Sequence, residues 1–496
     1  MMNKKNTGFS ASGGKTLACL FLGSCLMFAG CETSMAPRKD DRGKEAFVSA
    51  PQVAFQPEKV KKDIEEFIES CTAENGLIAS FSNSSPYFFG MDTGLFHTCY
   101  YGKMGYLEDQ VFTYDIALAV IGLLLLGKRE EAEQILDVFE EEFYLKKNGR
   151  KGFFNSYALT SRIPVQELHL GSDGDRIHAG PTLWVAIAAL NHTKIVRNTR
   201  YLGFVLDALD WCRTELTYFR FPDGERGGVS MGFGWGPEWS KIFSTEHNID
   251  YFAVLRMLDE IYEESPDEVR AIFKEKNIDQ AWLRDEMKHI GRWLYQIVFD
   301  KEYYCFIAGV NEFGVDRLKI LDGSSWGLGG VGPENFEKWG IDLDRLIKST
   351  ESYFCSTYEL PNGKIIKGFD FTDAEGTGYS RDPLVWFEGT GQMIIAYNEL
   401  SSYYKKKGYL ERANRYRSKA ISYTNDIFAF SYYYELDGAL PYMAILLKEK
   451  QVVKTLKYEW EIPRGRGGEW VRSVSSTMWF LYAVSDFYNS MKWSLD

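Results

Sequence analysis

Residues 239–250, WSKIFSTEHNID, hold side chains that could perform acid–base chemistry. Ser244 can cap a helix, which would place Glu246 and His247 in its first turn. Apolar and aromatic neighbours would raise the pKa of Glu246, as a general acid requires. His247 and Asn248 would then orient that carboxyl group or bind hydroxyl groups of a ligand. The alternative is that Glu246 only complements the helix dipole, as acidic residues in first turns commonly do.

A second carboxyl group stands among aromatic residues in the run WFEGTGQ, residues 386–392. A charge on Glu388 between aromatic rings, at the start of a buried helix, is costly unless it has a task or a partner. The two glycines of the run would let a ligand or a neighbouring helix approach closely. A purely structural ion pair with Arg381 is the alternative, so the run predicts a catalytic or a paired glutamate.

Asp115 and Asp322 begin two further apolar segments, Asp115 after Tyr114 and Asp322 in the run DGSSW that ends at Trp326. Aspartate at a helix start is often a plain N-terminal preference, so a capping role is an open alternative for both. We expect these two carboxyl groups to bind hydroxyl groups rather than to transfer protons.

The segments that carry these acids are helices of two kinds. Six segments are apolar on every side, which requires burial on all sides, whereas the segments between them are apolar on one side only and must lie outside. The six buried segments begin near Tyr114, Trp184, Ser244, Asp322, Leu384 and Ser475. The one-sided segments are 57–72, 128–143, 200–217, 278–300, 334–355 and 409–427. The alternation predicts an all-α fold, an (α/α)6 toroid of six helical hairpins, with short strands in loops such as 146–178 and 218–243.

In such a ring the inner helices run parallel, so their N-termini open at one end. The residues at these N-termini should therefore line one mouth, and we expect Asp115, Glu246, Asp322 and Glu388 to meet there. The last inner segment, 474–484, should close the ring against the first. We find no linker after residue 60, so residues 57–496 are predicted to form one domain.

The pattern resembles the (α/α)6 toroids of the six-hairpin glycosidase superfamily, and the sequence is similar to bacterial lipoprotein members of that superfamily. The resemblance covers roughly residues 100–490, and LDGSSW, residues 321–326, matches the usual LD-x-x-x-W run. The matching runs are YDIALAVIGLLLLG, STEHNID, WFEGTGQM with the later DGALPY, and SSTMWFLYAV. Since this fold hosts hydrolases, phosphorylases, lyases and epimerases, the resemblance specifies the fold more sharply than the substrate.

The first 30 residues are predicted to be a lipoprotein signal peptide. Lys4, Lys5 and Lys15 form a basic region, and the apolar run 17–29 is shorter than the about 20 residues of a membrane-spanning helix. The run ends in FAG before Cys31, which resembles the lipobox of bacterial lipoproteins. An ordinary cleaved signal with an incidental cysteine is the alternative.

Residues 31–56 are predicted to be a flexible tether between the lipid anchor and the toroid. Glu32 follows the lipidated cysteine, which resembles lipoproteins sorted to an outer membrane. We therefore expect a protein of the bacterial cell envelope, anchored through Cys31 and facing the periplasm or the cell exterior.

The charge and composition exclude several classes of function. The chain has 496 residues, 45% of them hydrophobic, and a net charge of −12 that becomes −15 once the three lysines of residues 1–30 are removed. Such an acidic protein is a poor partner for nucleic acid, and it disfavours polyuronate substrates. No CxxC pair occurs, and the histidines lack a shared spacing, so we expect no metal site, no cofactor and scattered thiols.

The leading hypothesis is a monomeric glycoside hydrolase that acts on a neutral oligo- or polysaccharide. Glu246 would protonate the leaving oxygen and Glu388 would activate water, in an inverting reaction with carboxyl groups about 6.5–9.5 Å apart. The expected substrate-binding residues are Tyr114, Asp115, Trp239, His247, Asn248, Asp322, Trp326, Arg381 and Trp386, the tryptophans by stacking on sugar faces. The alternatives are a lyase, phosphorylase or epimerase on the same fold, or a lipoprotein that binds glycan without catalysis.

Overall fold

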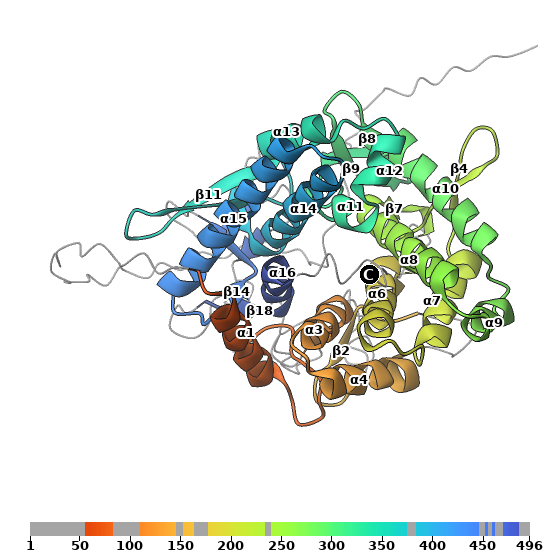
Figure 1. The fold of residues 1–496 in the computed structure, drawn as a ribbon, viewed down its shortest axis with the longest axis horizontal. Helices are drawn as coiled ribbons and strands as arrows, with labels where there is room; N and C mark the ends of the chain where they lie inside the picture. The colour runs from red at the N-terminus through yellow and green to blue at the C-terminus, as the bar shows by residue number, and fades with distance from the viewer. Residues whose placement is uncertain are drawn as a thin grey trace, which may run out of the picture.

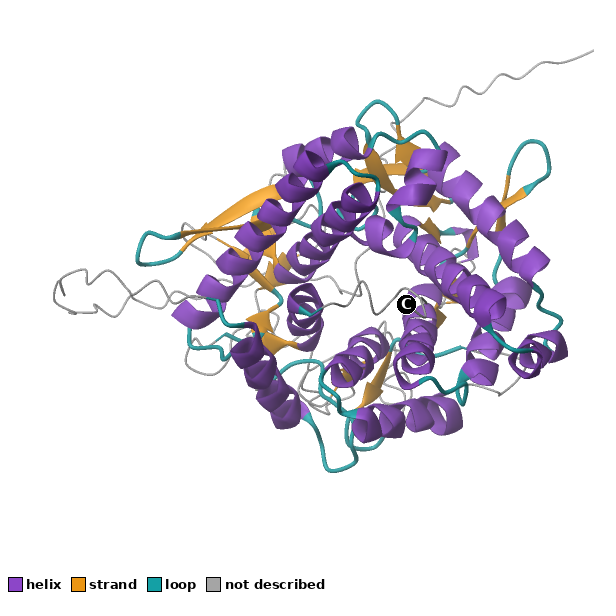
Figure 2. Ribbon diagram, in the orientation of Figure 1, coloured by secondary structure: helices purple, strands orange, loops and turns teal. Residues whose placement is uncertain are grey.

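The computed structural model describes residues 55–82, 110–144, 152–162, 177–233, 240–373, 383–445, 452–454, 459–461 and 470–485. These residues form a ring of inner helices inside a second layer of helices (Figures 1 and 2). The inner helices are α3 (Thr113–Leu125), α6 (Ala179–Val196), α8 (Thr245–Glu264), α11 (Ser325–Gly330), α14 (Phe387–Lys406) and α16 (Val474–Val484). Each contacts the next in this order, and α16 contacts α3, so the ring closes as predicted.

The inner helices are buried all round because their apolar residues cover every side. In α3 the residues from Ile116 to Ile121 have no exposed surface, and in α6 nearly the whole helix is buried. Glycine permits close packing at several contacts between inner helices, including those of Gly122 and Gly391. A Cβ on Gly122 would lie 2.4 Å from Sδ of Met478 on α16, and one on Gly391 would lie 2.9 Å from the main chain of Trp479. Gly391 therefore lets a neighbouring helix approach, which is one of the two roles expected for the glycines of this run.

The outer layer is formed by helices that pack on the inner ring or on one another. They are α4 (Arg129–Val138) with the π-helical turn η3 (Phe139–Phe143), α7 (Leu202–Glu215), α9 (Asp267–Glu275), α10 (Gln280–Gln296), α12 (Pro333–Lys338), α13 (Leu343–Phe354), α15 (Leu410–Tyr433) and α1 (Pro57–Cys71). Of these, α4, α7, α10, α15 and α1 each pack against an inner helix, whereas α9 packs against α7. The first helix, α1, is the outer partner of the last inner helix, α16 (Figure 1). The N- and C-terminal parts of the ring are thereby joined into one closed structure.

Two predicted segments differ from the structure. The single outer helix expected at 334–355 is split into α12 and α13, because the chain turns at Gly340, which has a φ of +83° that favours glycine. The inner segment expected from Leu384 begins with the strand β13 (Leu384–Trp386), and the helix starts only at Phe387.

Short antiparallel strands fix where the inner helices begin. Five strands lead directly into an inner helix: β1 (Gln110–Phe112), β3 (Ile177–His178), β7 (Phe243–Ser244), β13 and β18 (Arg472–Ser473). Their partners are β2 (Ser156–Ala158), β6 (Gly232–Phe233), β9 (Cys305–Asn311), β12 (Ile365–Phe369) with β15 (Met443–Ile445), and β14 (Leu440–Pro441). Because each strand is hydrogen-bonded up to the first helical residue, the side chains of the first helical turn are held in place.

The remaining strands pair with the strands above or with one another. They are β4 (Tyr218–Arg220), β5 (Arg226–Val229), β8 (Phe299–Asp300), β10 (Gly314–Lys319), β11 (Cys355–Glu359), β16 (Val452–Lys454) and β17 (Glu459–Glu461). Among the described helices, none is both long and apolar enough to cross a bilayer.

Candidate active site

The four predicted acids lie at the N-terminal ends of four inner helices. Asp115 is the third residue of α3, while Glu246 and Glu388 are the second residues of α8 and α14. Asp322 lies just before α11. The structure brings all four together. The charges of all four carboxyl groups reach a single hydroxyl group, that of Tyr442, and together with burial they raise its pKa.

Tyr442 was not expected from the sequence. It lies in the run DGALPY, between β14 and β15, and its main-chain oxygen accepts a hydrogen bond of 3.3 Å from the main-chain N–H of Phe387. That bond fixes Tyr442 beside the N-terminus of α14. The only signal in the sequence was its place in a run that resembles the superfamily.

Glu246 has the properties of a proton donor. Its side chain keeps part of its surface exposed, in contrast to the other three acids of the cluster, which are buried. Even so, loss of hydration among the surrounding protein atoms raises its pKa well above the usual value, and the charges of Asp322, Asp250 and Glu388 raise it further. The carboxyl group therefore keeps its proton to a higher pH than an ordinary glutamate does, and part of its side chain remains exposed.

The other three acids also have raised pKa values, each mainly because burial removes hydration. The pKa of Glu388 is raised to about 8, although hydrogen bonds from Tyr114 and Ser475 oppose the rise. The pKa of Asp115 is raised to about 7 and that of Asp322 to about 6.

A hydrogen-bonded chain fixes Glu388. The indole N–H of Trp479 on α16 donates to Oη of Tyr114 at 2.9 Å, and the Tyr114 hydroxyl donates to Oε1 of Glu388 at 2.6 Å. Three inner helices, α16, α3 and α14, are joined in this way. Tyr114 therefore acts on the cluster through Glu388, in addition to any contact with a ligand.

Three tryptophans from alternate inner helices pack together at the centre of the ring. The ring centroids of Trp184 (α6) and Trp326 (α11) are 4.8 Å apart, and Trp479 (α16) lies 5.5 and 5.6 Å from them. The indole N–H of Trp326 donates to Oδ1 of Asp250 at 2.8 Å. Asp250, fully buried one turn below Glu246 on α8, thereby links the helix that carries Glu246 to the aromatic cluster.

The position of Trp326 corrects the expectation that it stacks on a sugar. Its side chain is 2% exposed and Trp386 is 3% exposed, so both belong to the core, and neither can offer a ring face to a ligand in this conformation. A tryptophan that stacks on a sugar and a tryptophan that packs in the core can have the same sequence pattern beside a helix start. The sequence alone therefore could not separate these two roles.

Asn248 is also held by the fold. Its amide accepts from the main-chain N–H of Val229 at 2.7 Å and donates to the carbonyl groups of Val229 and Ser244 at 3.0 and 2.8 Å. These bonds join β5 to the N-terminal end of α8, so the side chain serves the fold and is not available for a ligand hydroxyl. His247 is buried, and burial lowers its pKa to about 4, so it is neutral at physiological pH.

Three predicted residues, Trp239, Arg381 and Cys31, lie outside the described residues. Within the described ranges, no three His, Cys, Asp or Glu side chains are placed to share a metal ion. Cys71, Cys212 and Cys305 are buried thiols, whereas Cys355 is exposed.

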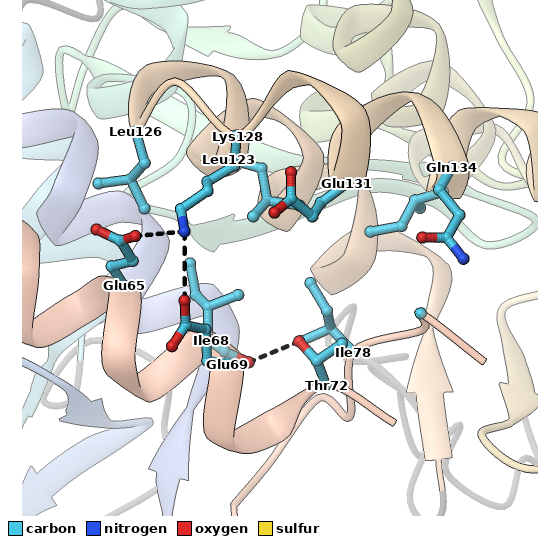
Figure 3. Close-up of a pocket in the computed structure, with 12 residues that line it drawn as sticks. Glu65, Ile68, Glu69, Thr72, Ile78, Leu123, Leu126, Lys128, Glu131 and Gln134 are labelled. Atoms are coloured by element: carbon cyan, nitrogen blue, oxygen red, sulfur yellow. Dashed lines mark hydrogen bonds and ion pairs between the residues drawn. The ribbon is translucent and has the colours of Figure 1, made fainter. Parts of the chain in front are cut away.

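A pocket of about 300 Å³ lies elsewhere, between α1, α4 and the C-terminal end of α3 (Figure 3). Its wall includes Leu123 and Leu126, at the opposite end of α3 from Asp115. Lys128 crosses it and pairs with Glu65 at 2.5 Å and Glu69 at 3.3 Å. This pocket contains none of the predicted site residues.

Solved structures with the same architecture were found, although no protein-family model and no curated protein matches the sequence. A family 76 glycoside hydrolase from a bovine Bacteroides thetaiotaomicron strain is 11% identical with a TM-score of 0.53, over 87% of this chain and 78% of its own. A family 76 mannosidase from Bacteroides thetaiotaomicron is 9% identical with a TM-score of 0.51, over 87% and 97%. The predicted fold class is thus confirmed: the chain is all-α and has the (α/α)6 toroid, the architecture that these two glycoside hydrolases share.

Proposed function

We propose that the protein is a glycoside hydrolase that cleaves a neutral oligo- or polysaccharide at the bacterial cell envelope. The observation that carries the proposal is the partly exposed side chain of Glu246, whose pKa is raised, among three further carboxyl groups at the N-terminal ends of the inner helices. Glycoside hydrolysis requires such a pair, a protonated acid for the leaving oxygen and a second carboxyl group on the other side of the sugar.

In the proposed reaction Glu246 donates its proton to the glycosidic oxygen. A second carboxylate of the cluster, Glu388 in the assignment made from the sequence, accepts a proton from the attacking water. Tyr114 and Asp115 would bind sugar hydroxyl groups, together with Trp239 and Arg381. The lipid anchor at Cys31 would hold the enzyme at the membrane surface that meets the glycan.

The test is a panel of purified glycans, with release of reducing ends as the measurement. α-Mannan belongs on the panel because both structures above are family 76 glycoside hydrolases, one of them a mannosidase. Hydrolysis that is lost in Glu246→Gln and retained in Glu263→Gln, an exposed glutamate at the far end of the same helix, would support the proposal. Formation of an unsaturated product would indicate a lyase, and dependence on phosphate a phosphorylase. An isomerised sugar would indicate an epimerase, and binding without turnover the non-catalytic alternative.

A further inference from the structure

The helix α15 carries an exposed stripe along its outer side. Its buried side includes Tyr416 and Phe430, whose rings pack on Tyr404 and Phe387 of α14. The opposite side therefore faces away from the ring, where α15 belongs to the outer layer (Figure 1). Residues three or four positions apart share one side of a helix. The outer stripe consists of Leu410, Asn414, Arg417, Ile421, Asn425, Phe428 and Tyr432.

Four side chains of the outer stripe are large and apolar or aromatic. Leu410, Ile421 and Tyr432 are 60%, 47% and 51% exposed, and they follow one another at 11-residue intervals, which is three helical turns. Phe428 stacks on Tyr432 with ring centroids 6.3 Å apart. This row extends over about 33 Å of the helix. Single exposed apolar side chains are common on protein surfaces, whereas a continuous row of them marks an interaction surface.

The outer stripe differs in charge from the protein as a whole. The chain has a net charge of −12, yet the stripe contains Arg417 and no acidic residue. Glu411, the acid nearest to the stripe, is turned about 100° from its first residue. The turn between α14 and α15 adds Lys405 and Lys406, which are exposed and form no ion pair with any residue that the structure describes. Tyr409, in the same turn, is 54% exposed.

The described chain begins at this surface. Phe55, the first described residue, packs edge-on against Phe428 with ring centroids 5.4 Å apart. Cys31, which the sequence predicts to carry a lipid, precedes Phe55 by 24 residues. A chain of that length spans at most about 80 Å. The predicted tether therefore starts from the outer stripe and favours contact of this side with a bilayer. Because the tether is long, the surface must supply affinity of its own.

We infer that the outer stripe, together with Lys405, Lys406 and Tyr409, binds the surface of a phospholipid bilayer with anionic headgroups. The apolar and aromatic side chains enter the boundary between headgroups and acyl chains, and the basic side chains meet the phosphates. Contact in the outer layer leaves the N-terminal ends of the inner helices open to a ligand. The inference goes beyond the proposed function and does not depend on it.

The test measures vesicle binding by the chain from Glu32 to Asp496. This chain lacks the predicted signal and the lipid, and it keeps every described residue, including α1, which completes the ring. The probes are vesicles of phosphatidylglycerol and, as the neutral counterpart, of phosphatidylcholine, separated from free protein by flotation at low salt. We expect binding to the anionic vesicles that weakens with added salt, and binding to the neutral vesicles that is weaker by about tenfold or more. Absence of binding to the anionic vesicles would overturn the inference.

A double variant tests the two lysines of the turn. One basic residue close to an anionic surface strengthens binding by roughly fivefold, so Lys405→Gln with Lys406→Gln should weaken it by about 30-fold. The matched control removes two exposed lysines elsewhere, Lys274→Gln on α9 with Lys288→Gln on α10, and should change binding little. An equal loss in both pairs would show a response to net charge alone and would contradict the assignment of this surface.

A single variant tests the apolar part of the stripe. Ile421→Glu places a carboxylate in the middle of the stripe at an exposed position, and binding to phosphatidylglycerol vesicles should fall by about tenfold or more. Phe313→Glu makes the same change in charge on the turn between β9 and β10. It replaces the most exposed large apolar side chain of the described residues and should bind like the parent chain.

Two outcomes for Ile421→Glu would overturn the inference. Normal vesicle binding by this variant, beside a loss in the lysine pair, would reduce the surface to a patch of cations that binds any polyanion. A change from dimer to monomer in sedimentation velocity would instead assign the outer stripe to contact with a second copy of this chain.

Discussion

The hydroxyl of Tyr114 donates a 2.6 Å hydrogen bond to Glu388 across 274 residues of sequence. The bond joins the first inner helix to the fifth, and Trp479 of the last inner helix donates to the same hydroxyl. Three inner helices, α3, α14 and α16, are thus joined at one point of the ring. The position of Glu388 depends on ring closure as well as on its own helix.

Removal of this link should cost stability. Tyr114→Phe keeps the aromatic side chain and removes its hydroxyl group. Both Oε1 of Glu388 and the indole N–H of Trp479 then lose their hydrogen bond to that hydroxyl. Buried groups that lose a hydrogen bond cost about 1–3 kcal/mol, so the free energy of unfolding should fall by that order. Urea unfolding at constant pH measures it. Tyr409→Phe, at an exposed position, is the control, and an equal loss there would contradict the explanation.

Stability should fall as the pH rises from about 4.5 to 8. The native state retains protons on Asp115, Asp322 and Glu388, whose folded pKa values are raised to about 7, 6 and 8. The unfolded chain releases these protons near the usual values, so unfolding becomes easier with each step in pH through that window. The stabilisation is complete below the pKa that these carboxyl groups have in the unfolded chain. It is lost as the pH rises through their pKa in the folded protein.

The measurement is the free energy of unfolding at pH 5 and pH 8, where we expect a difference on the order of several kcal/mol. Glu388→Gln, which imitates the protonated carboxyl group, should reduce that difference. Glu411→Gln, at an exposed position on α15, should not. Stability that is flat or rises over this range would show that the cluster is already ionised.

Catalysis should depend on Glu246 through kcat. Glu246→Gln removes the proton donor and keeps the shape, so kcat on a hydrolysed glycan should fall by about 100-fold or more with KM little changed. Loss of the basic limb of the pH profile should accompany it. Near-normal turnover of Glu246→Gln would contradict the prediction and would show that Glu246 only complements the start of its helix.

The inner helices could be predicted because a helix that is apolar on every side must be buried on every side. The same reasoning placed Asp115, Glu246, Asp322 and Glu388 at one end of the ring. It failed where partners are distant in sequence, since nothing near Tyr442 indicates a carboxyl neighbour. It also could not separate a tryptophan that stacks on a ligand from Trp326, which is buried against two other indoles.

The lipid anchor remains a prediction from the sequence. Cys31→Ser should move the protein from the membrane fraction to the soluble fraction, because the thiol that would carry the lipid is lost. Fractionation followed by immunodetection is the measurement, with Cys25→Ser, in the signal segment, as the control. A Cys31→Ser protein that stays bound to the membrane through an uncleaved N-terminus would contradict the lipoprotein assignment.

The tryptophan cluster should support the site through Asp250. Trp326→Phe removes the indole N–H that donates to Asp250 and leaves a small cavity, so a loss on the order of 2–4 kcal/mol in unfolding free energy is expected. If the hydrogen bond carries part of this loss, Trp326→Phe should cost less in an Asp250→Ala background, and the difference measures the coupling. Trp339→Phe, a half-buried indole that packs on Phe252, controls for the change in size. Because Asp250 lies one turn below Glu246, a coupling near zero would mean that the tryptophans fill the ring without fixing the helix that carries the proton donor.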